Sequence, residues 1–150
     1  MSGPVPALGA LPLLLLLLLL LASPGGATEV EVQVLNTADA AGVMRVELCQ
    51  EAEWLQGCAI SAQAPARPGL STVTVPDVPP GVYGVIAHHD SDGDGEVNRN
   101  FLGLPTEGIG FSRDAQIRFG PPRFGDAALR IGGDRAVVPV TLHFERPSGR

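Results

Sequence analysis

The sequence predicts an all-β protein, an antiparallel β-sandwich of six to seven strands with a long ordered loop. Short segments alternate polar and apolar residues, which is the period of a strand with one buried face. Glycine- and proline-rich turns separate these segments. Because almost no helical period is found after residue 27, the strands have to pack on one another as two sheets.

Six segments carry the strand pattern. They are residues 29–35, 43–49, 70–75, 82–89, 127–131 and 136–144. We expect the first two strands to pair with each other and the last two to form a hairpin. Residues 82–89 are apolar on both faces, which predicts a central strand, whereas Pro139 lacks the N–H of a ladder and predicts an edge or a bulge.

The N-terminal segment has the composition of a targeting signal. Residues 11–21 form a leucine-rich run interrupted only by Pro12, and small residues follow it up to Ala27. This pattern predicts a signal peptide over residues 1–27 that is cleaved after Ala27, and the run is too short for a comfortable membrane span. We therefore expect a single domain over residues 28–150, secreted or periplasmic, with no transmembrane segment in the mature chain.

The charge balance excludes one class of partner. The chain has 10 basic residues, all of them arginine, against 16 acidic residues, and its net charge is −6. Without a basic patch interleaved with aromatic residues, nucleic acid is not expected as a partner.

The two cysteines, Cys49 and Cys58, are expected to form a disulfide, because the chain is predicted to be exported and the pair closes a small loop. A metal-binding pair or a thiol nucleophile is the alternative. The absence of a CxxC spacing and of a neighbouring histidine disfavours it.

An acidic segment directly after the predicted central strand is the sharpest chemical feature. Asp90, Asp92 and Asp94 alternate with small residues, and Glu96 and Asn98 follow at the same interval, as in a calcium-binding loop of the EF-hand type. The position of the closing bidentate glutamate is occupied by Phe101, and the flanking segments are not helical. The sequence therefore predicts a calcium loop of another kind, completed by Glu107, which the neighbouring glycines allow to fold back.

The alternative is a loop without metal, in which the Asp and Asn side chains cap a tight turn by Asx-type hydrogen bonds.

The residues around this loop are the candidates for a recognition surface. These are His89, Phe101, Glu107, Phe111 and Ser112, within or beside an apolar, glycine-rich segment that is expected to be ordered. Adjacent strand residues point to opposite faces, so His88 and His89 cannot both bind one metal. No nucleophile motif accompanies His89, and a histidine hydrogen-bonded into the loop is favoured over a general base.

Several motifs are similar to those of an exported bacterial family, the domain of unknown function 2141. They include Pro80-Gly81-Val82-Tyr83, His89-Asp90, the run from Asn100 to Gly103, Gly110-Phe111-Ser112 and Pro121-Pro122-Arg123-Phe124. The first of these motifs also resembles the turn of transthyretin-like (prealbumin-like) sandwiches. The resemblance implies that fold and an exported location, but no activity, because the family has none assigned.

These observations together predict an exported, non-catalytic binding module with a structural Ca²⁺ in its Asp-rich loop and a protein or carbohydrate ligand. Two alternatives stay open: an enzyme that uses His89 and Asp90, or a metal in the same loop, and a structural subunit of the cell envelope.

Overall fold

The computed structural model describes residues 2–4, 26–100, 103 and 105–144. Most of the predicted signal peptide, together with Phe101, lies outside the described residues. No helix in the described part of the chain is long and apolar enough to cross a membrane.

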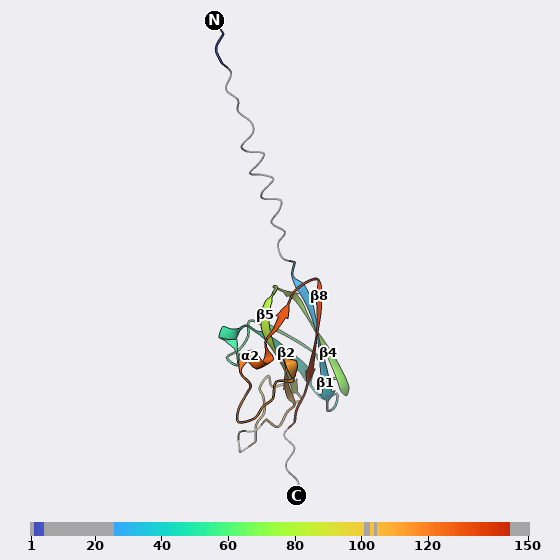
Figure 1. The fold of residues 1–150 in the computed structure, drawn as a ribbon. Helices are drawn as coiled ribbons and strands as arrows, with labels where there is room; N and C mark the ends of the chain where they lie inside the picture. Colours follow the sequence, from blue (N-terminus) through green and yellow to red (C-terminus); the bar gives the residue numbers. More distant parts are fainter. Residues whose placement is uncertain (1, 5–25, 101–102, 104, 145–150) are drawn as a thin grey trace.

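The described residues form a sandwich of two β-sheets, which confirms the predicted fold class (Figure 1). The strands are β1 (Thr28–Thr37), β2 (Val43–Cys49), β3 (Ile60–Pro65), β4 (Gly69–Val78), β5 (Gly81–Asp90), β6 (Ile109–Phe111), β7 (Leu129–Ile131) and β8 (Arg135–Thr141). Three short helical segments complete the fold: η1 (Glu51–Glu53), η2 (Ser112–Asp114) and α2 (Phe124–Ala127).

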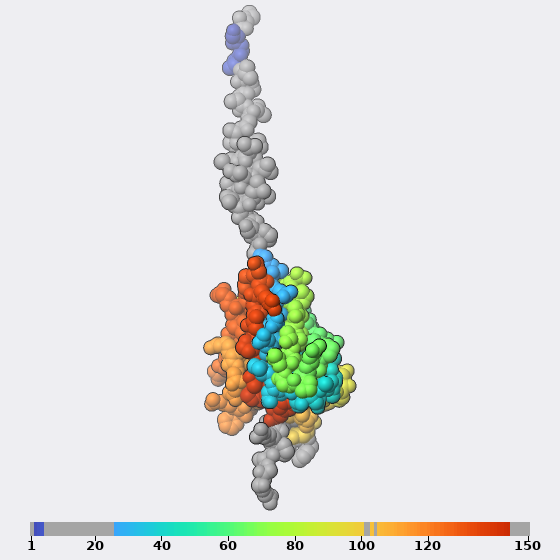
Figure 2. All heavy atoms as spheres, turned by 90° about the vertical axis from the view of Figure 1, so that its right-hand side faces the viewer, coloured from blue at the N-terminus to red at the C-terminus, as the bar shows by residue number. Residues whose placement is uncertain are grey.

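One sheet has the order β4-β1-β8, and the other has the order β3-β2-β5-β6, with β7 paired to β5 at its other end. Figure 2 views the molecule from the side of the three-stranded sheet, with β1 in blue. Strand β5 is central, as predicted from its two apolar faces. Strand β8 is an edge strand, which accommodates Pro139.

Two predicted pairings are wrong. Strand β1 pairs with β4 and, in parallel, with β8, whereas β2 lies in the opposite sheet. The last two strands do not form a hairpin, because β7 pairs with β5 and β8 pairs with β1. The turn between them therefore connects the two sheets, which lets both strands bury apolar side chains in the interior between the sheets.

The main core lies between the sheets. It contains the inward-facing residues of each long strand, among them Val32, Met44, Val75, Tyr83 and Val140. The hydroxyl of Tyr83 donates a hydrogen bond to the carbonyl of Pro79 at 2.9 Å, which satisfies its only buried polar atom. This core holds the end of β5, and so the start of the Asp-rich loop, in a fixed position.

A second apolar cluster covers the outer face of the five-stranded sheet. Phe111, Ala115 and Ala127 are buried there against Trp54 and Ile86. The Trp54 ring lies near Phe111 and Phe124, with ring centroids 5.8 Å away in both cases. Trp54 therefore covers the outer face of β5, and this cluster explains why β5 is apolar on both faces.

Candidate functional site: the Asp-rich loop and its surroundings

Asp90 ends strand β5 and anchors the Asp-rich loop. Its carboxylate is fully buried and accepts hydrogen bonds from the backbone N–H of Gly93 at 2.8 Å and of Gly95 at 3.0 Å. Arg45 Nε donates to the same carboxylate at 2.6 Å. The two glycines adopt positive φ, of 76° and 84°, which aims their N–H groups back at Asp90.

The ion pair between Arg45 and Asp90 was not predicted from the sequence. Arg45 lies on β2 opposite His88 of β5, two positions from Val43, which is the residue opposite Asp90. Burial raises the pKa of Asp90, but the hydrogen bonds from Arg45, Gly95 and Gly93 outweigh burial and hold this pKa below its usual value. Arg45 is a charged residue on a predicted strand, and an acidic loop follows another predicted strand. This combination was the sequence signal that could have indicated the ion pair.

Glu107 folds back onto the loop. Its Oε1 accepts hydrogen bonds from the N–H of Ser91 at 2.9 Å and the hydroxyl of Ser91 at 2.7 Å. Its Oε2 lies 3.0 Å from Nε2 of His88 and accepts the N–H of Asn98 at 3.2 Å. Burial raises the pKa of Glu107, yet the bonds from Ser91, His88 and Asn98 lower it to about 2.

The exposed acidic residues of the loop form Asx-type turns. Asp92 Oδ1 accepts the N–H of Asp94 at 3.2 Å, and Asp94 Oδ1 accepts the N–H of Glu96 at 2.8 Å. The side-chain amide of Asn98 donates to Asp92 Oδ2 at 2.7 Å. The capping role that we considered as the alternative to a metal is therefore present in this structure.

The same loop brings three carboxylates together. Asp90, Asp92 and Glu107 each offer an oxygen that lies within 4.8 Å of those of the other two. Asp90 and Glu107 are buried, whereas Asp92 is exposed. Of the six predicted ligands, these three converge. The side chains of Asp94 and Glu96 are not part of this group of carboxylates, whereas the side-chain amide of Asn98 contacts Asp92.

The two histidines serve different loops. His88 lies on the outer face of β5 and contacts Glu107. His89 points to the other face, where its Nε2 lies 2.8 Å from the carbonyl oxygen of Ala41 in the connection between β1 and β2. Asp39 is a second, more distant partner of His89, at 3.8 Å. Each histidine is thus engaged in holding one loop against the sheet.

The predicted recognition surface needs correction. His89, Glu107, Phe111 and Ser112 are all buried, and Phe101 lies outside the described residues. Phe111 packs in the second apolar cluster. Because their side chains point into the protein, the four buried residues position the segment from β5 to α2 and cannot form its exposed surface.

Residues 116–123, which we call the exposed loop, form a second accessible part of that segment besides the Asp-rich loop. Phe119 is fully exposed, with Arg118 and Arg123 nearby in the lining of one shallow cavity of about 730 Å³. The chain before the exposed loop is anchored by Ser112 of η2, whose hydroxyl donates to the Ala127 carbonyl at 2.6 Å and accepts the Val85 N–H at 2.9 Å.

The other end of the exposed loop is fixed by Trp54, whose indole N–H donates to the carbonyl of Pro122 at 2.9 Å. Sequence reasoning missed the exposed loop, although an aromatic residue flanked by arginines and prolines was a usable signal. The loop is therefore held at both ends while its aromatic side chain faces solvent.

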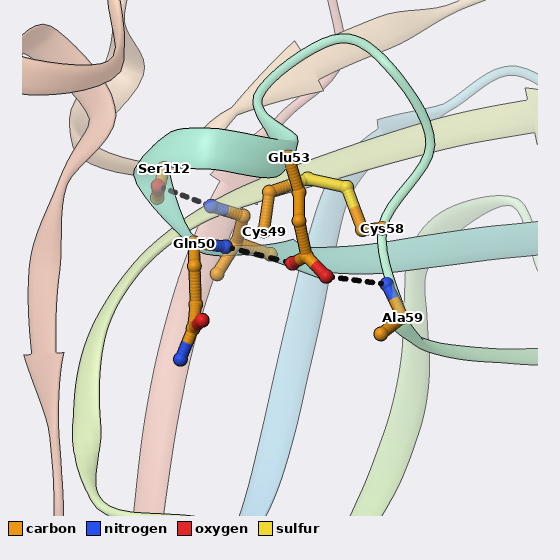
Figure 3. Close-up of a disulfide and its surroundings, with 7 residues drawn as sticks. Cys49, Gln50, Glu53, Cys58, Ala59 and Ser112 are labelled. Atoms are coloured by element: carbon orange, nitrogen blue, oxygen red, sulfur yellow. Dashed lines mark hydrogen bonds between the residues drawn. A yellow bond between two sulfur atoms is a disulfide. The ribbon is translucent and has the colours of Figure 1, made fainter.

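The predicted disulfide between Cys49 and Cys58 is present (Figure 3). The disulfide closes a loop from Cys49 to Cys58. Glu53 stabilises this loop, because its carboxylate accepts the N–H of Gln50 at 3.1 Å and the N–H of Ala59 at 3.3 Å. Trp54 follows Glu53 directly. The covalent loop therefore sets the position of Trp54 over β5 and, through Pro122, that of the exposed loop.

Comparisons with known proteins identify the family. No curated protein and no solved structure matches the chain. The family model described as "Uncharacterized protein conserved in bacteria (DUF2141)" matches residues 32–138, which run from β1 to β8 and include the Asp-rich loop and the disulfide. The chain belongs to this uncharacterised bacterial family, DUF2141, as its motifs predicted.

Proposed function

We propose that the protein is an exported, non-catalytic binding module in which Ca²⁺, held by Asp90, Asp92 and Glu107, rigidifies the Asp-rich loop. The observation that carries the calcium part is the convergence of these three carboxylates within 4.8 Å. Arg45 compensates only one of the three charges. A divalent cation with oxygen preference would relieve the remaining repulsion.

The existing hydrogen bonds are compatible with this proposal. Each carboxylate oxygen has two lone pairs. Asp90 Oδ1 and both oxygens of Asp92 accept one hydrogen bond each and so keep a lone pair for an ion. Glu107 accepts two hydrogen bonds at each oxygen, so it would coordinate an ion in exchange for one of them, such as that of the Ser91 hydroxyl. Exposed Asp92 provides access from solvent, and backbone carbonyls and water would complete the six to eight ligands that Ca²⁺ takes. In an extracellular or periplasmic setting even a site of millimolar affinity would be filled.

Export is proposed from the leucine-rich run over residues 11–21 and the small residues that follow it. The binding role is proposed for the exposed loop, because Phe119 is a large apolar side chain in full contact with water. An aromatic side chain with a polar surround suits a protein or carbohydrate ligand. The buried His89 offers no comparable support for an enzyme.

Calcium titration by calorimetry tests the metal site. Asp92→Asn and Asp94→Asn remove the same charge from the same loop and keep the same kind of Asx turn, but only Asp92 belongs to the group of three. We expect Asp92→Asn to weaken Ca²⁺ binding by about tenfold or more, and Asp94→Asn to change it little. At a hundredfold excess over the Kd, Ca²⁺ should add about 3 kcal/mol to the free energy of unfolding. No heat, together with an unchanged melting temperature, would remove calcium from the proposal.

The binding role is tested separately with Phe119→Ala. The variant should lose retention on envelope polysaccharide or envelope protein fractions, while it keeps the wild-type melting temperature and Ca²⁺ affinity. Leu70→Ala, at an exposed leucine of β4, is the matched control. Equal retention of both variants would refute a role for the exposed loop.

A further inference from the structure

Among the described residues, no second strand pairs with β8 from Arg135 to Pro139, and the structure defines which peptide groups of β8 face away from β1. The N–H of Glu29 donates to the carbonyl of Asp134, and the N–H of Leu142 donates to the carbonyl of Leu35, both at 3.0 Å. Only every second residue of a parallel strand bonds to the same neighbour. The peptide groups of 136, 138 and 140 therefore face β1, whereas those of Arg135, Val137 and Pro139 face away from it.

Within the described residues, one end of the outer edge of β8 is covered by β6 and by η2, both of which lie against this strand. At that end, Ile109 and His143 exchange two backbone hydrogen bonds, of 3.2 and 2.9 Å. From Arg135 to Pro139, β8 pairs with β1 alone. The side chain of Val137, in the middle of this stretch, is 51% exposed.

A groove of about 470 Å³ runs along this uncovered stretch, which is the size of a ligand pocket. Its apolar lining consists of Leu129 of β7 and of Ala136, Val137, Val138 and Pro139 of β8. A strand added to β8 would therefore place every second side chain over an apolar surface.

Two arginines give the groove a positive charge on a protein whose net charge is −6. Arg113 donates to the carbonyls of Gly125 and Ala128, which position the guanidinium without neutralising it. Arg130 has no side-chain hydrogen bond or ion pair to any other described residue. The one acidic residue in the lining, Asp114, is paired with His143 at 2.9 Å.

We propose that β8 binds an extended acidic segment of a partner protein, which adds a strand at Arg135 to Pro139 and places carboxylates beside Arg113 and Arg130. Backbone pairing would give affinity, and the two arginines would select acidic side chains. A second copy of this chain is disfavoured as the occupant. Edge-to-edge pairing of two β8 strands would bring the arginines of both grooves together. The groove is separate from the Asp-rich loop, so this inference does not depend on Ca²⁺.

The probe is a blocked heptapeptide of alternating valine and glutamate, compared with the same peptide carrying lysine in place of glutamate. Binding is followed by the backbone amide NMR signals of the whole protein. We expect the acidic peptide to shift the signals of Arg135 and Val137 and to protect the Val137 amide from hydrogen exchange. The lysine peptide should bind at least about tenfold more weakly.

Arg130→Glu should reverse this preference, whereas Arg67→Glu, at an exposed arginine of another surface, should leave it unchanged. Val137→Pro should abolish binding, because it removes an outward N–H, and Val137→Thr should retain it. If Val137→Pro unfolds the protein, the peptide preference of Arg130→Glu still tests the proposal. Equal binding of both peptides, no binding, or shifts confined to the exposed loop would overturn the proposal. So would a concentration-dependent dimer that protects the Val137 amide without peptide.

Discussion

Nε2 of His88 and Oε2 of Glu107 lie 3.0 Å apart, although the two residues are 19 positions apart in the chain. Both side chains are buried, and Glu107 is also bonded to Ser91 and Asn98. This contact joins the two ends of the Asp-rich loop. These hydrogen bonds hold the loop at both ends and place Glu107 beside Asp90 and Asp92.

Glu107→Gln should destabilise the protein by about 2 kcal/mol, because an amide replaces a buried carboxylate that accepts four hydrogen bonds. Urea unfolding at pH 7 measures this difference. Glu96→Gln removes the same charge at an exposed position of the same loop and serves as the control. Equal midpoints for the two variants would show that Glu107 does not hold the loop.

The same residue predicts a dependence of stability on pH. The folded-state pKa of Glu107, about 2, is below its usual value of 4.5, so its contribution is present above pH 4.5 and is lost as the pH falls toward 2. The difference in free energy of unfolding between wild type and Glu107→Gln should therefore shrink over this window. A difference that stays constant from pH 6 to pH 2.5 would contradict the assignment.

Arg45→Met should destabilise the protein by about 3 kcal/mol, because it leaves the fully buried carboxylate of Asp90 without its cation. Arg135→Met breaks ion pairs with Glu29 and Glu31 at an exposed position and should cost below about 1 kcal/mol. Thermal unfolding of both variants gives the comparison. If Arg135→Met proved the more damaging change, Arg45 would not be the anchor of Asp90.

Gly84→Ala should displace Trp54, because the added Cβ would lie 2.4 Å from Cζ3 of the indole ring. The ring is packed between Phe111 and Phe124 and cannot yield easily, so we expect a loss of about 1–3 kcal/mol. Trp54 is the sole tryptophan, and its fluorescence reports the movement directly. Gly125→Ala, where no atom lies within 4 Å of the new Cβ, should leave the emission unchanged. An unchanged emission spectrum for Gly84→Ala would refute this packing.

Several strands and the acidic loop can be predicted from the order of polar and apolar residues over short stretches of the sequence. The period-two alternation of residues 29–35 and 43–49 predicts β1 and β2, and the two apolar faces of residues 82–89 predict a central strand. The Asp-rich segment also predicts a folded acidic loop, since its glycines and Asx residues favour tight turns. Such patterns depend only on which residues are near one another in the chain.

Strand partners and burial were decided by tertiary structure. The alternation of polar and apolar residues predicts that β1 has one buried face. It does not predict whether β2 or β8 is its neighbour in the sheet, because the same valines of β1 would be buried in either case. For the same reason, the sequence pattern could not predict that Phe111 and Ser112 are buried and that Phe119 is exposed. The ion pair between Arg45 and Asp90 likewise exists only because β2 lies beside β5. The amino-acid sequence by itself determined where strands and the acidic loop form, whereas packing of the two sheets decided which carboxylates meet and which surfaces stay open.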